Sequence, residues 1–209
     1  TGARNADRWG RSPAATNPAA QIAALLHEQG TQGIHALIVQ PYSDALSLLG
    51  RYLQQLLMES LGKELDRQGE HAGSGVLVLG TKGSTDQHSL MQQVLDGRAN
   101  ALCCFVDVAR RNPALVDAQG RPLADHLFSM LEGTREALRQ RNRPALLVQL
   151  PDADAHGMGL VIALFERVVG IWAELLDINA YDQPAVESGK RAASATQSLL
   201  LRIQAALKN

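Results

Sequence analysis

Four short apolar runs, separated by longer helical patterns, constrain the fold of this chain most strongly. The runs cover residues 34–40, 75–79, 101–108 and 144–150. The helical patterns cover residues 18–29, 44–67, 85–96, 122–141, 156–177 and 187–207. Strands that are apolar at nearly every position and alternate with helices predict a parallel sheet covered on both faces. The expected fold class is therefore α/β, a doubly wound three-layer α/β/α sandwich with a mostly parallel sheet, followed by a C-terminal helical arm.

The charge balance excludes several classes of partner. The 209 residues include 20 basic and 21 acidic side chains, for a net charge of -1. A chain without excess positive charge has no electrostatic attraction for nucleic acid or an anionic membrane. No apolar stretch approaches the roughly 20 residues that a membrane-spanning helix needs. We therefore expect no nucleic-acid partner and no membrane association.

The two cysteines, Cys103 and Cys104, are neighbours inside the third apolar run. Side chains of adjacent strand residues point to opposite faces, so a disulfide between them would be strained. They are expected to be buried, reduced thiols, which are typical of a reducing compartment. Because the polar N-terminus also lacks the apolar centre of a signal peptide, the expected location is cytoplasmic.

We expect the chain to be divided into three segments. Residues 1–16 are polar, do not begin with methionine and contain two glycines and a Ser-Pro pair, so they are interpreted as a connector from a missing N-terminal part. Residues 17–180 hold the predicted strands and would form the α/β domain. Residues 181–209 would carry a polar motif and the last helix.

Glu59 is the first candidate for chemistry. An apolar stripe with helical spacing runs through Ala45, Leu49, Tyr52 and Leu56. Glu59 is the next member of that stripe, and Gln55 lies one turn before it. An acid at the end of an apolar stripe would be partly desolvated, which would raise its pKa toward the range of a general base. The alternative is an exposed Glu59–Lys63 pair, which contributes about 0.3–0.5 kcal/mol.

His88 is the second candidate. It follows the second apolar run, after a turn that contains Gly80 and Gly83. Ser84 and Gln87 have the spacing of a capping box, which would place His88 in the first turns of a helix. The partial positive charge of a helix N-terminus favours a neutral imidazole, and such a ring can exchange a proton near pH 7.

Two other interpretations of this segment remain open. His88 can simply pack or cap. The loop Thr81–Thr85 can bind a phosphate with its backbone amides, although it lacks the lysine spacing of a P-loop.

Lys190 is the third candidate, in the polar segment 182–190. Pro184 precedes it and the last helical pattern begins there, so a solvated helix lysine is the plain alternative. Asp182 and Gln183 can equally be turn and cap residues.

No metal site is expected. Five histidines have no partner at metal-ligand spacing: His27, His35, His71, His126 and His156. Asp152, Asp154 and His156 lie close in sequence, but they are expected to cap the following helix. The chain also has no Gly-x-Ser-x-Gly motif, which argues against an α/β-hydrolase.

Three ordered motifs resemble those of the phosphoglucose isomerase family. Residues 52–63 match its Gln-x-x-Met-Glu-Ser-x-Gly-Lys helix, and residues 80–88 resemble the Gly-x-x-Gly-Ser-Thr-Asp-Gln-His form of its histidine loop. Residues 181–190 match its Asp-Gln-x-x-Val-Glu-x-Gly-Lys motif. The resemblance runs from about Asn17 to the last helix and implies a sugar-isomerase (SIS) type of α/β domain.

The resemblance implies a role for each candidate. Glu59 would be the base that moves a proton between C2 and C1 of glucose 6-phosphate and fructose 6-phosphate through a cis-enediol. His88 and Lys190 would assist ring opening. Gln55 and Gln183 would contact the phosphate end of the substrate. The partner is then a sugar phosphate, and neither a metal nor another cofactor is needed for an acid–base reaction.

The chain also departs from the family pattern. It resembles only the C-terminal SIS domain, and neither the family's Gly-Gly-Arg segment nor its Ser-Lys-Thr-type phosphate loop is found. The family is dimeric, with an active-site histidine from the neighbouring subunit, so a homodimer in which His88 reaches the partner's site is implied. We expect the segment alone to be inactive or very slow. The alternative function is a non-catalytic sugar-phosphate-binding or dimerisation module.

Overall fold

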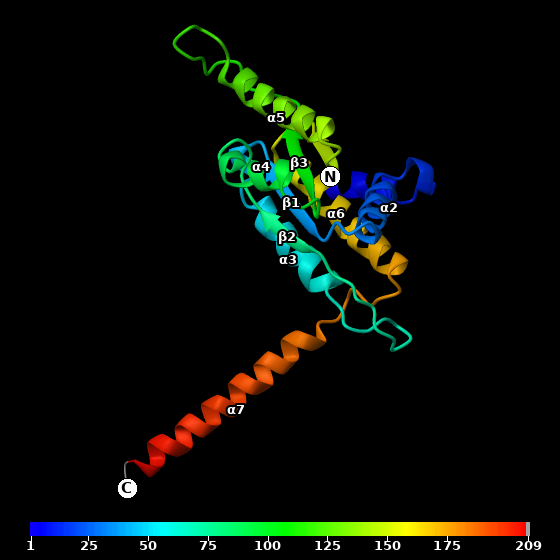
Figure 1. Ribbon diagram of the computed structural model, residues 1–209, viewed down its shortest axis with the longest axis vertical. Coiled ribbons are helices and arrows are strands. Elements are labelled where there is room, and N and C mark those ends of the chain that lie inside the picture. Colours follow the sequence, from blue (N-terminus) through cyan, green and yellow to red (C-terminus); the bar gives the residue numbers. More distant parts are fainter. Residues whose placement is uncertain (208–209) are drawn as a thin grey trace.

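The computed structural model describes residues 1–207 and contains one parallel sheet flanked by helices (Figure 1). The elements are, in order, α1 (Gly2–Trp9), η1 (Ala14–Thr16), α2 (Pro18–Thr31), β1 (Ala36–Pro41), η2 (Asp44–Leu46), α3 (Leu49–Leu61), β2 (Leu77–Gly80), α4 (Gln87–Asp96), β3 (Ala101–Val108), α5 (Leu123–Gln140), β4 (Ala145–Leu150), α6 (Ala155–Leu175) and α7 (Pro184–Ala206).

The four strands are all parallel and have the order β2-β1-β3-β4. Side chains of β1 alternate between the two faces, as strand geometry requires. Leu37 and Val39 pack with residues of α2, α3 and α6, whereas Ile38 packs with Phe105 of β3 and with residues of α4 and α5. The sheet is therefore covered on both faces, and the predicted three-layer α/β class is confirmed.

The expected strands agree with the observed ones to within a few residues, but the helix expected at 44–67 is shorter than predicted. Residues Asp44–Leu46 form a separate 3-10 helix, and α3 begins only at Leu49. It ends at Leu61 because the backbone of Gly62 is extended, with φ -76° and ψ 93°. The predicted Glu59 helix is thus thirteen residues long, and Glu59 lies in its last turn.

The opening residues are folded onto the domain. Helix α1 packs against α6, with Ala6 in contact with Leu160 and Ala163. A Cβ added at Gly2 would lie 2.0 Å from the carbonyl oxygen of His156, so the two helices approach at backbone distance. The segment therefore forms part of the packed structure, and its expected role as a connector stays a prediction.

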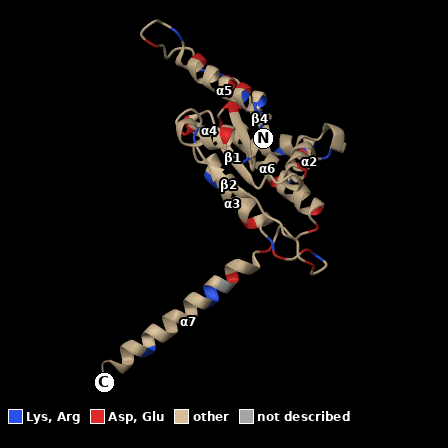
Figure 2. Ribbon diagram, in the orientation of Figure 1, with Lys and Arg blue, Asp and Glu red and all other residues tan. Residues whose placement is uncertain are grey.

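Helix α7 extends away from the sandwich (Figure 1), and the described side chains along it are exposed. It corresponds to the expected helical arm, whose residues 208–209 lie outside the described part of the chain. Acidic and basic residues are interspersed on α5, whereas α7 carries one acidic residue near its start, followed by basic residues (Figure 2). Within residues 1–207, no helix has the length and hydropathy that crossing a membrane requires.

Candidate active site

The face of α3 turned away from the core carries the first candidate residues. The buried stripe of this helix consists of Leu49, Gly50, Leu53, Leu57 and Leu61. It differs from the expected stripe, since Ala45 is outside the helix and exposed, while Tyr52 and Leu56 are only half-buried. Leu49, Leu53, Leu57 and Leu61 are spaced four residues apart, so they share one side of a helix with 3.6 residues per turn. Gln55 and Glu59 consequently lie on an exposed side.

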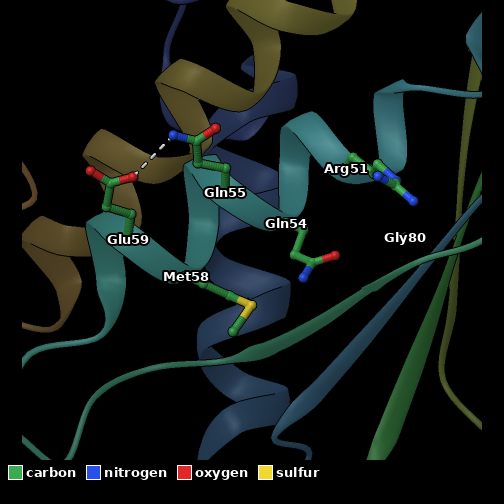
Figure 3. Close-up of a pocket in the computed structure, with 6 residues that line it drawn as sticks. All are labelled: Arg51, Gln54, Gln55, Met58, Glu59 and Gly80. Carbon is green, nitrogen blue, oxygen red and sulfur yellow. Dashed lines mark hydrogen bonds between the residues drawn. The ribbon is translucent and has the colours of Figure 1, made fainter. Parts of the chain in front are cut away.

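These residues line an open hollow of about 580 Å³ between α3 and the end of β2. Its lining residues are Arg51, Gln54, Gln55, Met58, Glu59 and Gly80 (Figure 3). Gln55 Nε2 donates a hydrogen bond to Glu59 Oε2 at 3.2 Å. Gly80 allows the strand end to approach the helix, because a Cβ there would lie 2.5 Å from the carbonyl carbon of Gly50.

A second hollow, of about 300 Å³, shares Gln55 and Glu59 with the first. Its other lining residues are Tyr52, Leu56, Ser60 and Gln183. Gln183 immediately precedes α7, far from α3 in sequence. The fold therefore brings three of the predicted site residues together: Gln55, Glu59 and Gln183.

Lys63 does not form the side-chain pair with Glu59 that was the alternative interpretation. Its Nζ instead donates to the carbonyl oxygens of Glu59 and Ser60, at 3.0 and 2.8 Å, and closes the C-terminal end of α3. Lys63 is 8% exposed, and this burial lowers its pKa despite the nearby charges of Asp182 and Glu59. Glu59 itself is exposed, as in the alternative interpretation, and the expected partial desolvation of its carboxylate is not observed.

His88 is exposed on the second residue of α4 and lines neither hollow. The predicted capping box is wrong. The N-cap residue is Asp86, and Ser84 has a left-handed backbone with φ 60°. The side chain of Gln87 turns inward instead and donates to the hydroxyl oxygen of Tyr42 at 2.5 Å. His88 thus lies at a helix start, as predicted, but for a different local reason.

The loop before α4 is poorly suited to binding a phosphate. Its amides at Thr81 and Gly83 donate to carbonyl oxygens of β1, at 2.9 and 2.8 Å. The amide of Lys82 donates to Asp86 Oδ2, and the amides of Thr85 and Asp86 donate within the loop. Because these donors are already engaged, the alternative interpretation of Thr81–Thr85 gains no support.

Lys190 lies on the exposed arm α7, and its Nζ is 2.7 Å from Glu187 Oε1. It lines neither of the two hollows around Glu59. The structure therefore does not bring Lys190 or His88 to the Gln55–Glu59 pair within the single chain.

Three lining residues were missed by the sequence reasoning: Arg51, Gln54 and Met58. Helical periodicity could have identified them. Positions 51, 55 and 59 are four residues apart and share a helix face with Glu59, and positions 54 and 58 lie next to that face. Arg51 differs from most arginines of the sandwich because, among the described residues, its guanidinium has neither an acidic partner nor a hydrogen bond. The hollow thus contains one carboxylate and one unpaired cation.

A larger cavity, of about 670 Å³, lies at the carboxyl ends of β1, β3 and β4 and contains none of the predicted site residues. There the buried Asp107 pairs with Arg111 at 2.5 Å. Asp154 caps α6 by accepting a hydrogen bond from the Gly157 amide at 2.8 Å, as the sequence predicted. Residues 1–207 contain no group of three or more His, Cys, Asp or Glu side chains placed to hold a metal ion.

Comparison with known proteins adds independent information. The sequence model of the phosphoglucose isomerase family matches residues 1–133. The glucose-6-phosphate isomerase of Thermosynechococcus vestitus is 45% identical over 190 residues, which are 90% of this chain and 36% of the relative. That of Nostoc punctiforme is 43% identical over 211 residues, covering 99% of this chain and 40% of the relative. The chain therefore spans little more than a third of the length of these relatives.

Solved structures agree with the fold. A hypothetical protein from Thermus thermophilus superposes with a TM-score of 0.84 at 28% identity, over 94% of this chain and 49% of the other. A glucose-6-phosphate isomerase from Chlamydia trachomatis superposes with a TM-score of 0.81 at 24% identity, over 88% of this chain and 39% of the other. At that identity the second likeness concerns the fold alone.

Proposed function

Because this chain belongs to the phosphoglucose isomerase family, we propose that it is a portion of an aldose–ketose isomerase that interconverts glucose 6-phosphate and fructose 6-phosphate. The substrate class is a sugar phosphate. The observation that carries the proposal is the hollow beside α3, where Glu59 and Gln55 of the first motif are hydrogen-bonded to each other. Gln183 of the third motif lines the adjoining hollow.

Glu59 has the role of general base. Its carboxylate takes the proton from C2 of the open-chain aldose and returns it to C1 through a cis-enediol. The hydrogen bond from Gln55 to one carboxylate oxygen restricts the rotation of Glu59 and leaves the other oxygen free to face the substrate. Gln55 and Gln183 bind the substrate at its phosphate end. A single acid–base group moves the proton, so the proposed reaction needs neither a metal nor an organic cofactor.

His88 and Lys190 have the proposed role of opening the sugar ring. Both are exposed and both lie outside the hollows around Glu59 of the same chain. We therefore propose that the complete enzyme is a homodimer in which His88 serves the neighbouring subunit's site. An exposed imidazole at the start of α4 suits that role, since it is free to reach a second chain.

The proposed compartment is the cytoplasm. Cys103 and Cys104 are both free and buried in β3. Reduced cysteines of this kind are typical of a reducing compartment.

A second candidate function is favoured by the exposed positions of His88 and Lys190, outside the hollows around Glu59. The 209 residues span 36–40% of the relatives, and the family's Gly-Gly-Arg and phosphate-loop motifs are not found within them. Binding energy from the phosphate end is what positions the reacting carbons in such reactions. The 209-residue segment alone is therefore expected to isomerise the substrate very slowly. The alternative function is that of a sugar-phosphate-binding or dimerisation module.

The deciding experiment compares Glu59→Gln with the unchanged chain. Isomerisation of fructose 6-phosphate is followed by coupling the product to a dehydrogenase, and substrate affinity is measured by calorimetry. Loss of the base is expected to lower turnover at least about 100-fold with affinity nearly unchanged. The matched control is Glu70→Gln, because Glu70 is exposed and lines neither hollow.

If the chain alone has no turnover, the same variants are compared in a chimera in which the chain replaces the corresponding part of the Thermosynechococcus relative. Equal loss of affinity and turnover in Glu59→Gln would favour the binding module. Unchanged turnover in an active chimera would overturn the assignment of Glu59 as the base.

A further inference from the structure

The side chain of Gln87 connects three separate elements. It is the residue before His88, yet its amide group points inward rather than toward the loop. The two N–H groups of Gln87 Nε2 are shared among three acceptors: Tyr42 Oη at 2.5 Å, the hydroxyl oxygen of Thr134, and the carbonyl oxygen of Met130 at 3.3 Å. Tyr42 directly follows β1, whereas Met130 and Thr134 belong to α5. The first residue of α4 is therefore fastened to the sheet and to the neighbouring helix.

Tyr42 is a rigid anchor for this contact. It is 4% exposed, and its ring packs edge-on against Phe105 with the ring centroids 6.0 Å apart. Gly83 lies directly against the ring, because a Cβ at that position would be 2.4 Å from Tyr42 Cδ2. Close packing of the buried ring restricts the position of its hydroxyl group, which is the acceptor for Gln87.

The loop that leads to α4 is held at the same place. Lys82 Nζ pairs with Asp44 Oδ1 at 2.8 Å, and the Gly83 amide donates to the carbonyl oxygen of Pro41 at 2.8 Å. Ser84 adopts a left-handed backbone at φ 60°, which a residue other than glycine keeps only where surrounding contacts enforce it. These contacts together restrict the conformation of the loop and of the helix start.

We propose that Gln87 is a positioning residue for His88. Successive helix residues project about 100° apart, so a glutamine that points inward at position 87 directs the next side chain outward. The bonds from Gln87 to Tyr42 and Thr134 fix the rotation of the first turn of α4 and with it the direction of the imidazole. The inference rests on the proposed role of His88 in ring opening.

The test uses substrates that differ in whether ring opening is needed. Fructose 6-phosphate is mainly cyclic, whereas a four-carbon aldose 4-phosphate stays open because its ring-closing hydroxyl carries the phosphate. Gln87→Met removes the amide at nearly constant length, and Tyr42→Phe removes only the hydroxyl that accepts from it. In the active chain or chimera, both variants are expected to lower kcat for the cyclic substrate about tenfold or more, with KM within about twofold. Turnover of the open-chain substrate is expected to stay unchanged.

Gln92→Met is the matched control. Gln92 lies on the same helix, is exposed, and donates to Asp96 Oδ2 of its own helix at 3.0 Å. The same chemical change there is expected to leave both substrates unaffected. Equal loss on both substrates in Gln87→Met, or no loss on either, would overturn the positioning role.

A measurement without substrate separates this inference from the proposed function. The ring signal of His88, assigned with His88→Gln in a two-dimensional NMR spectrum, is expected to shift and broaden in Gln87→Met and Tyr42→Phe but not in Gln92→Met. An unchanged His88 signal in both folded variants would overturn the inference. If Glu59→Gln leaves turnover intact, the proposed function fails, while the NMR result still decides whether Gln87 positions His88.

Discussion

Gln55 Nε2 lies 3.2 Å from Glu59 Oε2, one helical turn away on α3. Both side chains are exposed on the same face, and the hollow beside them also contains Arg51. A neutral donor at this distance orients the carboxylate without neutralising it. This hydrogen bond therefore restricts the orientation of the carboxylate, which suits the proposed role of Glu59 as a base.

Replacing Gln55 by leucine is expected to release the carboxylate of Glu59. A hydrogen bond to a charged group contributes about 1.5–3 kcal/mol, less where solvent competes, so we expect turnover to fall about tenfold and substrate affinity to weaken. Gln54→Leu is the control, because Gln54 lines the same hollow without contacting Glu59. Steady-state kinetics of both variants, in the active form of the protein, check this. An equal effect of the two substitutions would contradict it.

Gly80→Ala is expected to separate β2 from α3. The added Cβ would lie 2.5 Å from the backbone of Gly50, so one of the two backbone segments would have to shift. Such overpacking typically costs about 1–3 kcal/mol in the free energy of unfolding, which urea denaturation measures. Gly133→Ala is the control, since it lies within α5 with nothing within 4 Å, and alanine there is expected to stabilise the helix. Unchanged stability of Gly80→Ala would show that the two elements are not in close contact.

Cys103 and Cys104 are expected to be inert toward thiol reagents in the folded protein. Burial raises the pKa of each thiol to about 12, and the thiolate is the reactive form. Titration with an aromatic disulfide at about pH 8 should therefore detect no thiol in the native chain and two in denaturant. The exposed variant Ser47→Cys is the positive control and should react at once. Rapid reaction of the native protein would refute the burial of these thiols.

The loop that precedes α5 is expected to loosen in acid. A hydrogen bond from the Arg121 amide, with weaker ones from His126, the Arg121 side chain and the Gln119 amide, lowers the pKa of Asp117 to about 2 from an ordinary value of 3.8. Because the folded pKa is depressed, the stabilisation is fully present above about pH 4 and is lost as the pH falls toward about 2.

Hydrogen exchange at the two amides measures this loosening. Exchange of the Gln119 and Arg121 amides, corrected for its intrinsic pH dependence, should accelerate between about pH 4 and pH 2. In Asp117→Asn the same amides should exchange faster already at neutral pH and show little further change in acid. Equal protection in the two proteins would contradict the role of the carboxylate.

Much of the fold could be predicted from local pattern. The four apolar runs correspond to β1, β2, β3 and β4, and parallel strands joined by helices have few alternative arrangements. Helix ends were less accurate, because the extended backbone of Gly62 ends α3 several residues before the pattern ends. The stripe on α3 was only partly correct: Leu49 is buried and Tyr52 and Leu56 pack at the margin of the core, but packing against the sheet buries Leu53 and Leu57 instead of extending the stripe to Glu59.

The amino-acid sequence by itself determined the α/β class, the family and the placement of Glu59 on a helix and His88 at a helix start, because these follow from short-range periodicity and contiguous motifs. Only the tertiary structure decided which side chains meet. It placed Gln183 beside the Gln55–Glu59 pair, left His88 and Lys190 outside those hollows, and turned Gln87 toward Tyr42 and α5. Contacts between residues distant in sequence depend on how helices and sheet pack together, and no local spacing contains that information.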